Sequence, residues 1–282
     1  MDMQIVPMNE SHLDAAFALT QRLQWPHRRE DWQQALRLGE GLAAVEAGHL
    51  LGTALCWRWG SEYATLGLVI VADEAQGQGF GKQLMLAALD KLPGSNVRLH
   101  ATEAGRGLYE KLGFVATGWV EQHQSRALGA VDPIPPAVGQ WLRTAAPADI
   151  AQLVALDRQA HGQHRPELFA CLAHSAERIL LLEQTTGIEG FACLRRFGHG
   201  YVIGPVIAHD LAVARVLVSQ LLSGLNGQFV RIDTEAGNGL GDWLSGLGMA
   251  TVDAPTTMVK GVPWRPEVGG MQAFGLMTQA MA

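Results

Sequence analysis

The order of apolar and polar positions in the first half of the chain predicts a mixed α/β fold. Helices are expected over residues 11–23, with Ser11 as the N-cap, over residues 29–38 and 79–91, and around Tyr109. Apolar and β-branched runs predict strands at residues 4–6, 41–47, 50–59, 62–71, 97–102 and 114–122. Hairpin turns are expected at Gly48-His49 and Gly60-Ser61.

The rest of the chain repeats this pattern more faintly. Prolines gather around Asp132–Pro136 and mark a linker, so we expect two units, residues 1–130 and 140–282, as the length of 282 residues also suggests. The tetrapeptide Thr102–Gly105 recurs as Thr234–Gly237, and Leu112-Gly113-Phe114 has a counterpart in Leu247-Gly248-Met249. The two matches occur in the same order and are separated by nearly the same number of residues, which favours a duplicated fold.

One junction stands out for its chemistry. The β-branched run Val69–Val71 stops at acidic residues, and the chain passes through the three alternating glycines of residues 77–81 into an apolar helix. Glycines let the backbone approach a ligand closely, and the first amides of a helix are unpaired at its positive end. The junction can therefore hold a phosphate group, although the glycines alone equally suit an ordinary tight turn.

Two known phosphate motifs fit this junction poorly. A P-loop needs glycine in place of Gln76 and a hydroxyl residue in place of Gln83, so we exclude it. The dinucleotide fingerprint G-x-G-x-x-G differs in spacing, although Glu103 could imitate its ribose-binding acid. A nicotinamide enzyme stays a minor alternative, because no further strand–helix–strand units are evident after Glu103.

A third motif, Q/R-x-x-G-x-G/A, is matched by Gln76, Gly79 and Gly81, and residues 108–114 read LYEKLGF. In these two segments the chain resembles the GNAT superfamily of acyl-CoA-dependent N-acyltransferases. In the second half, the strand at Ile203–Val206 leads into a turn without glycines. That arrangement resembles tandem-GNAT proteins of the YitH type. The resemblance implies two GNAT-like domains, of which the second is degenerate and completes the acceptor site.

The resemblance assigns a set of residues to acetyl-CoA and none to a metal. It implies that Val71 N–H faces the thioester oxygen and that Tyr109 protonates the departing CoA thiolate as general acid. Thr102 stands where the family commonly has asparagine, and Gly105 where a small residue lets the cofactor approach. The implied cofactor-binding residues are Val69, Ile70, Val71, Gln76, Gly77, Gln78, Gly79, Phe80, Gly81, Lys82, Thr102, Gly105, Leu108 and Tyr109.

The acceptor is expected to be the amine of a small molecule that attacks the thioester directly in a ternary complex. Such an amine must lose a proton, and the sequence leaves four candidates to accept that proton: Glu62, His27, His100 and Glu103. Aromatic residues suggest a substrate wall or, equally, core packing. These are Trp25, beside His27, and the strand pair Trp57 and Trp59. A protein or peptide acetyltransferase and a non-catalytic acyl-CoA sensor are the alternatives.

Composition narrows the partners further. The net charge is −6 and no Lys/Arg block occurs, so neither nucleic acid nor an anionic membrane is indicated. Because the N-terminus has no signal-like pattern, we expect a cytoplasmic protein. Cys56, Cys171 and Cys193 are odd in number and widely spread, which argues against disulfides, and the pair His161 and His164 lacks a third metal ligand.

Overall fold

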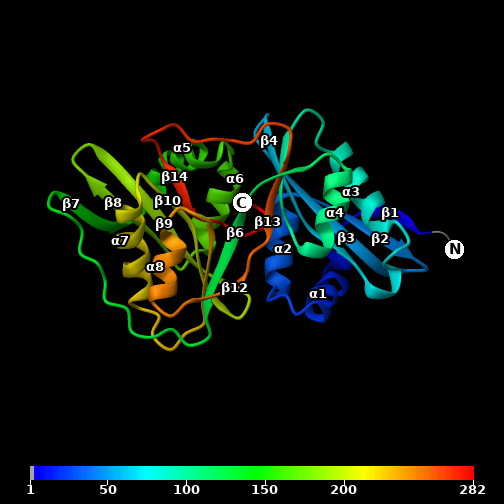
Figure 1. The fold of residues 1–282 in the computed structure, drawn as a ribbon, viewed down its shortest axis with the longest axis horizontal. Helices are drawn as coiled ribbons and strands as arrows, with labels where there is room; N and C mark the ends of the chain where they lie inside the picture. Colours follow the sequence, from blue (N-terminus) through cyan, green and yellow to red (C-terminus); the bar gives the residue numbers. More distant parts are fainter. Residues whose placement is uncertain (1–2) are drawn as a thin grey trace.

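A computed structural model describes residues 3–282 and shows two α/β halves lying side by side (Figure 1). The first half contains β1 (Gln4–Pro7), α1 (Leu13–Arg22), α2 (Arg29–Leu38), β2 (Glu40–Glu46), β3 (His49–Trp59), β4 (Tyr63–Val71), α3 (Phe80–Asp90), β5 (Asn96–Ala101), α4 (Glu103–Lys111) and β6 (Val115–Ser125). The second half contains β7 (Gln140–Thr144), α5 (Ile150–His161), α6 (Pro166–Ser175), β8 (Arg178–Gln184), β9 (Gly187–Phe197), β10 (Gly200–Ala208), α7 (Leu211–Leu222), β11 (Val230–Glu235), α8 (Leu240–Gly246), β12 (Ala250–Asp253), β13 (Thr256–Lys260) and β14 (Gln272–Gly275).

The two halves share one element order, which confirms the predicted mixed α/β duplication. Their strands form a continuous 14-stranded sheet in the order β1-β2-β3-β4-β5-β13-β6-β11-β10-β9-β8-β7, with β12 and β14 off this path. Neighbouring strands run antiparallel except for the pairs β4–β5 and β10–β11, which are parallel. Each parallel pair is joined through one helix, α3 or α7, as a parallel connection requires.

The halves exchange their last strands at the junction. The first part of β6 pairs with β13, whereas residues 120–125 of β6 pair with β11 of the second half. In return, β13 inserts beside β5 of the first half (Figure 1). Neither of the expected units 1–130 and 140–282 therefore forms its sheet from its own strands alone. The sheet of the first half includes β13, and that of the second half includes residues 120–125 of β6.

Strands β4 and β5 separate after a short contact. They pair only over Tyr63–Thr65, and beyond that point the β5 side of β4 has no strand partner among residues 3–282. A register shift against β3 lies beside Leu68, whose φ is +50°, and Thr53 Oγ1 donates to the Leu68 carbonyl at 2.8 Å. This bulge re-aims the end of β4 and opens a wedge between the two strands.

The corresponding wedge of the second half is filled. Strands β10 and β11 pair only at Tyr201 and Val202, but β14 pairs with β10 over Val206–Ala208. From β14 the chain continues into the first half, where Ala280 packs against Gly67: a Cβ on Gly67 would lie 2.7 Å from the Ala280 Cβ. Residue 282 consequently lies in the middle of the molecule (Figure 1).

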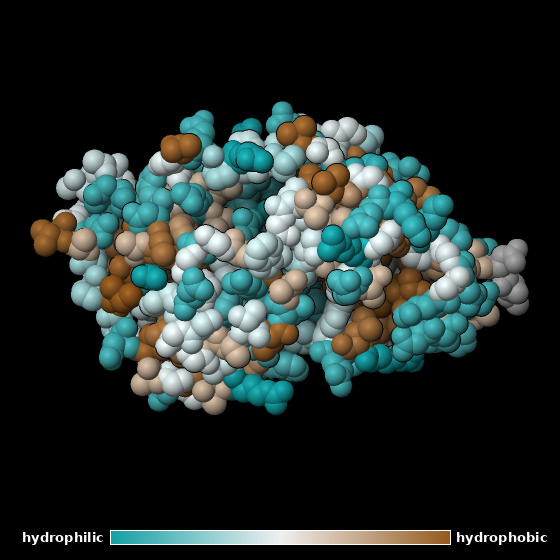
Figure 2. Space-filling view, in the orientation of Figure 1, coloured by the Kyte–Doolittle hydropathy of each residue, from teal (hydrophilic) through white to brown (hydrophobic). Residues whose placement is uncertain are grey.

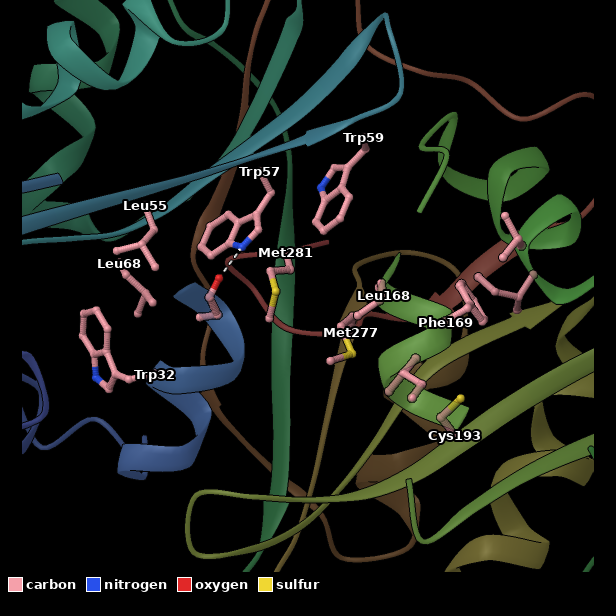
Figure 3. Close-up of a cluster of buried hydrophobic side chains, with 14 of the residues drawn as sticks. Trp32, Leu55, Trp57, Trp59, Leu68, Leu168, Phe169, Cys193, Met277 and Met281 are labelled. Carbon is pink, nitrogen blue, oxygen red and sulfur yellow. Dashed lines mark hydrogen bonds between the residues drawn. The ribbon is translucent and has the colours of Figure 1, made fainter. Parts of the chain in front are cut away.

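A hydrophobic core spans both halves behind this segment. Trp57 and Trp59 of β3 face α2, Met277, Met281 and the α6 residues Leu168 and Phe169 (Figure 3). On the outer face shown in Figure 2, hydrophilic residues predominate and hydrophobic ones are scattered. Within residues 3–282, no helix has the length and apolar character needed to cross a membrane.

Candidate active site

The glycine junction forms an open turn at the start of α3. Gly77 and Gly79 have φ values of +76° and +83°, and a Cβ on either would meet nothing within 4 Å. The first helical hydrogen bond runs from Gln83 N to Gly79 O at 3.1 Å, so the amides of residues 80–82 have no acceptor in the helix. These amides and the positive helix end together favour an anion such as a phosphate.

The turn lies against the end of β4 and against α4. The Gln76 side-chain amide donates to the Val71 carbonyl at 3.3 Å, which ties the turn to the strand. A Cβ on Gly81 would lie 3.5 Å from both Leu108 Cδ2 and Val71 Cγ2. The structure thus brings together Gln76, Val71, Gly81 and Leu108, four of the residues predicted to contact the cofactor.

Tyr109 is buried on α4 and is suited to donating a proton. Its side chain packs beside Phe114, with ring centroids 6.1 Å apart, and its hydroxyl has no hydrogen-bond partner among residues 3–282. Burial raises the pKa of Tyr109 to about 12, so the phenol stays protonated at neutral pH.

Gly105 lies one helical turn before Tyr109 and makes room for its ring. A Cβ at position 105 would meet Tyr109 Cε2 at 2.9 Å and the phenol oxygen at 3.2 Å. The family resemblance implied that Gly105 lets the cofactor approach. In the structure, the missing side chain at position 105 leaves room for the Tyr109 ring instead.

We therefore expect Gly105→Ala to displace the Tyr109 ring and to lower kcat by about tenfold or more, while the tyrosine itself is retained. Gly107→Ala is the matched control, since a Cβ at position 107 meets nothing within 4 Å on the same helix. Steady-state kinetics of both variants test this expectation. Equal kcat values for the two variants would contradict it.

A pocket between the halves opens beside the wedge of β4 and β5. This first inter-half pocket has a volume of about 120 Å³ and is lined by Trp25, His27, His100, Thr102 and Gln122 of the first half. The second half contributes Phe197, Arg231, Asp253 and residues 278–280. The wall is therefore aromatic and polar, and neither half forms it alone.

His100 presents an unprotonated nitrogen in this pocket wall. Its Nδ1 lies 2.6 Å from the Gln279 carbonyl, which can only accept, so Nδ1 carries the proton and Nε2 the lone pair. Nε2 is buried and has no partner among residues 3–282. Burial and the charge of Arg98 lower the pKa of His100 to about 3, so the ring is neutral.

His27 shares these properties across the pocket. Its Nδ1 is buried without a partner in the described part of the chain. Burial and the charge of Arg231 lower the pKa of His27 to about 4. Arg231 itself is held by Asp233, to which its Nε and Nη2 donate at 2.9 and 2.7 Å. Both histidines are therefore neutral at neutral pH, and each has one buried ring nitrogen without a partner among residues 3–282.

These low pKa values predict acid sensitivity. The unfolded chain binds protons at His27 and His100 near pH 6.5, whereas the folded chain does so only near pH 4 and 3. Their contribution to stability is thus present above pH 6.5 and is lost as the pH falls toward 4 and 3. We expect each of the two histidines to lower the free energy of unfolding by about 2 kcal/mol at pH 5 relative to pH 7.

Urea unfolding at pH 7 and pH 5 checks this prediction. His100→Gln should reduce the loss of stability at pH 5, whereas His49→Gln, in an exposed hairpin, should not change it. If both variants lost as much stability as the original chain, the buried neutral state assigned to His100 would be wrong.

Three residues predicted to touch the acceptor lie elsewhere. Trp57 and Trp59 are core residues. Trp57 Nε1 donates to the Ala35 carbonyl at 2.9 Å (Figure 3), and Trp59 Nε1 donates to Thr65 Oγ1 at 2.9 Å. Glu62 is exposed in the turn before β4, so at about 3.3 Å per residue it lies roughly 30 Å from Val71. None of the three can line a pocket near Val71, because two are enclosed and one is remote.

The other predicted residues lie nearer the site. Trp25 and His27 line the first inter-half pocket, as does Thr102, the residue that precedes α4. Glu103 is exposed at the start of α4, and Lys82 is exposed in the first turn of α3. The sequence reasoning missed Arg231, Phe197 and residues 278–280, because no local pattern marks residues that reach the pocket from the other half.

The second half offers no equivalent open turn. Asp210 caps α7, its carboxylate accepting from Val213 N at 2.9 Å, so one helix amide is already bonded and a negative charge stands at the helix start. A phosphate would meet repulsion at this position. With β14 also filling the wedge, the second half repeats neither the open turn nor the unpaired strand edge of the first half within residues 3–282.

Comparison with known proteins matches each half of the chain to a GNAT family model. The acetyltransferase (GNAT) family matches residues 7–114, and an acetyltransferase (GNAT) domain matches residues 153–270. The uncharacterized N-acetyltransferase YitH of Bacillus subtilis is 27% identical over 260 residues, which is 89% of each chain.

Solved structures share the whole architecture. One from Pyrococcus horikoshii, provisionally described as an acetyltransferase, has a TM-score of 0.78 at 20% identity and covers 99% of this chain and 96% of its own. A tandem GNAT protein from the clavulanic acid biosynthesis pathway has a TM-score of 0.62 at 11% identity, covering 92% and 98%. At these identities the structures establish the fold alone. With both halves matched by the family, the chain belongs to the GNAT acetyltransferases and carries two GNAT domains in tandem.

Proposed function

We propose that this protein transfers an acetyl group from acetyl-CoA to the amine of a small molecule by direct attack in a ternary complex. The observation that carries the proposal is the open glycine turn at the start of α3, which contacts the end of β4 and Leu108 of α4, the helix that carries the buried Tyr109 phenol, next to the edge of β4 that has no strand partner among residues 3–282. The acyl donor and the acceptor would approach the wedge from its two sides.

The residues present fit acetyl-CoA as the donor. Residues Gln76–Lys82 would hold the pyrophosphate through backbone amides, helped by the exposed charge of Lys82. Val69, Ile70 and Val71, on the unpaired edge of β4, would hydrogen-bond the pantetheine arm. Gln76 stands where an arginine is common in the family, so binding should depend mainly on the amides.

Two groups would act on the reacting atoms. The Val71 N–H would stabilise the negative charge that develops on the thioester oxygen, and losing one such donor typically costs about 3 kcal/mol of barrier. Tyr109, protonated because burial raises the pKa of its phenol to about 12, would donate a proton to the departing thiolate.

His100 is the favoured partner for the amine of the acceptor. Its Nε2 lone pair is fixed by the Nδ1 hydrogen bond to Gln279, so it can accept an amine N–H and orient the nitrogen for attack. Because its pKa is lowered to about 3, the ring would not retain the proton, which would pass on to solvent. His27 is the second candidate for this role.

The shape of the first inter-half pocket favours a small acceptor. Its volume of about 120 Å³ corresponds to roughly four water molecules at about 30 Å³ each, and residues of both halves line it. Trp25 and Phe197 provide apolar surface for part of the acceptor. A protein tail would need an open groove leading to Val71, so the peptide alternative is less well supported.

Thiol release from acetyl-CoA, measured across a panel of small amines and lysine-containing peptides, tests the proposal. Turnover with a small amine and not with the peptides is the expected result, whereas peptide turnover alone would overturn the acceptor class. Calorimetric binding of acetyl-CoA without turnover of any amine would support the non-catalytic sensor. The nicotinamide alternative finds no support, because β5 is followed in the sheet by antiparallel β13 and the family matches are acetyltransferases.

A further inference from the structure

The guanidinium of Arg231, on β11, has one edge that the protein does not use. An arginine carries five N–H donors in a planar fork. Asp233 accepts from the Nε and Nη2 atoms of Arg231 at 2.9 and 2.7 Å, which occupies one edge of this fork. Nη1 has no hydrogen-bond partner among residues 3–282. The edge formed by Nη1 and Nη2 therefore keeps two parallel donors.

This free edge can be reached from the first inter-half pocket. Arg231 is only 7% exposed, and it is one of the residues that line the pocket. Its Nη1 keeps accessible surface, in contrast to the enclosed ring nitrogens of His27 and His100. The small exposed part of the Arg231 side chain thus includes an unused donor, and a ligand in the pocket can accept from it.

The equivalent arginine of the first half shows what such a fork binds. Arg98 stands between two core positions of β5 as Arg231 does on β11, and it lines a second inter-half pocket. All three of its nitrogens have partners: Nε donates to the Ala282 carbonyl at 2.9 Å, Nη1 lies 3.4 Å from a Glu235 carboxylate oxygen, and Nη2 lies 3.4 Å from His161 Nδ1. Segments of the chain fill this fork, whereas one edge of Arg231 is left to a ligand.

A second buried arginine adds positive charge beside Arg231. Arg195, on β9, is 3% exposed, and it donates to the carbonyl of Gly204 at 3.1 Å and to that of Met277. It forms no ion pair within residues 3–282. Burial lowers the pKa of Arg195 to about 10, so the group is still charged at neutral pH. A buried charge without a counterion costs free energy.

The neighbouring carboxylates do not compensate this charge. The guanidinium carbons of Arg195 and Arg231 lie 5.5 and 5.7 Å from the centroid of the Phe197 ring, so both charges flank one wall residue of the pocket. The two closest buried carboxylates each pair with another arginine, Asp233 with Arg231 and Asp31 with Arg28, both at 2.7 Å. One positive charge is left over, and it suits one anionic group in the pocket.

One carboxylate also lines the pocket. Asp253 is exposed, so water screens its charge, and one of its oxygens accepts from Ala254 N at 2.9 Å. It pairs with no arginine or lysine among residues 3–282 and leaves the free edge of Arg231 open. The buried side of the pocket is therefore positive and its exposed rim is negative.

Building on the acetyl transfer proposed above, we propose that the acceptor is a small amino acid and that Arg231 is the residue that selects it. The Nη1 and Nη2 donors form two parallel hydrogen bonds to the carboxylate of the ligand, a planar group that matches the planar guanidinium. The amine lies toward the wedge between β4 and β5, where Gly67 and Leu68 line the same pocket. The volume of about 120 Å³ and the surfaces of Trp25 and Phe197 favour a compact, apolar side chain.

The reaction on such an acceptor balances without a further reactant. The neutral amine nitrogen forms a bond to the acetyl carbon, and the bond between that carbon and the CoA sulfur breaks. Tyr109 donates a proton to the departing thiolate, and the proton that the amine loses restores the phenol by way of solvent. The products are CoA and an N-acetyl amino acid, whose carboxylate keeps its hydrogen bonds to Arg231.

Thiol release with matched pairs of acceptors tests the proposal. Each small amino acid, such as glycine, alanine, serine, valine and β-alanine, is compared with its own amide, which keeps the amine and the side chain but lacks the negative charge. We expect kcat/KM for the best amino acid to exceed that for its amide about tenfold or more. The amide amine is the less basic of the two, so ionisation of the amine cannot produce this preference.

Variants assign the preference to Arg231. Arg231→Lys keeps the charge beside Asp233 but loses the planar edge, so we expect KM for the preferred amino acid to rise about tenfold, kcat to stay within about threefold, and the preference over the amide to disappear. Arg196→Lys is the matched control on β9, where the Arg196–Glu177 pair is 51% and 47% exposed, and it should keep the preference. The double variant Arg231→Gln, Asp233→Asn removes both charges of the buried pair together and should lose the preference as well.

The outcomes separate this inference from the proposed function. Thiol release with amides as efficient as with amino acids, or a preference that survives in both Arg231 variants, would overturn the acceptor class and uphold the transferase. If no amine gave thiol release, a saturable rise in Tm with an amino acid that is lost in Arg231→Lys would uphold the carboxylate site and contradict the transferase. Neither thiol release nor a rise in Tm would overturn both.

Discussion

Replacing Tyr109 by phenylalanine is expected to lower kcat by about 10²- to 10⁴-fold while leaving the affinity for acetyl-CoA nearly intact. The ring packing against Phe114 and over Gly105 is retained in this variant, so only the hydroxyl is lost. Because burial raises the pKa of Tyr109 to about 12, the phenol is protonated at neutral pH and its hydroxyl is available as a proton donor.

Steady-state kinetics and calorimetry with acetyl-CoA separate the two effects. Tyr201→Phe, on β10 of the second half, is the matched control and should leave kcat unchanged. An unchanged kcat in Tyr109→Phe would remove this residue from the role of general acid. A large loss of acetyl-CoA affinity would instead assign the hydroxyl to binding.

The second large effect concerns the stability of the interface between the halves. Arg165 and Asp157 form a bidentate pair at 2.8 and 2.6 Å, both side chains are fully buried, and Arg165 also donates to the Met281 carbonyl at 2.7 Å. Asp157→Asn leaves the arginine charge buried and uncompensated. We expect it to reduce the free energy of unfolding by about 3–5 kcal/mol.

Chemical denaturation measures this loss directly. Asp14→Asn removes an ion pair with Arg29 whose side chains are 82% and 46% exposed, and it should change the free energy of unfolding by less than about 1 kcal/mol. Similar losses in the two variants would show that the buried pair does not hold the segment that ends at residue 282.

Local patterns predicted the elements that depend on local chemistry. The helix at residues 29–38 was placed at its observed bounds, and the turn from Gln76 to Gly79 lies between β4 and α3 as expected. Glycine spacing, apolar periodicity and helix starts are properties of neighbouring residues. They could therefore be read without knowledge of the sheet.

Features that join distant segments could not be read in this way. The orientation of His100 depends on the carbonyl of Gln279, 179 residues later, and the pocket wall depends on the exchange of β6 and β13. Nothing near His100 or Arg231 in the sequence marks these contacts. For Trp57 and Trp59 the sequence left a substrate wall and core packing equally open, and the choice depended on distant segments, because the core that encloses them includes residues of both halves.

The predicted duplication of the fold is confirmed, but the residue alignment between the two halves differs by one position from the one that the sequence suggested. The side chains of Val97 and Leu99 belong to the core of the first half, as those of Val230 and Ile232 do in the second, so the two pairs are equivalent positions of β5 and β11. In that alignment Thr102 corresponds to Glu235, whereas the tetrapeptide match pairs it with Thr234. A slip of one position on a strand exchanges its two faces, so the matching tetrapeptides are not structural equivalents.

We propose that the chain holds one acetyl-CoA, on the turn from Gln76 to Lys82. Calorimetric titration of the full chain with acetyl-CoA tests it most directly, comparing Gly79→Asp, which brings a carboxylate to the pyrophosphate, with Gly79→Asn, which has a similar shape without the charge. We expect one site per chain, an affinity about tenfold or more weaker in Gly79→Asp than in Gly79→Asn, and no change of affinity in His209→Asp at the mirrored turn. Unaltered affinity in Gly79→Asp, or a loss in His209→Asp, would contradict it.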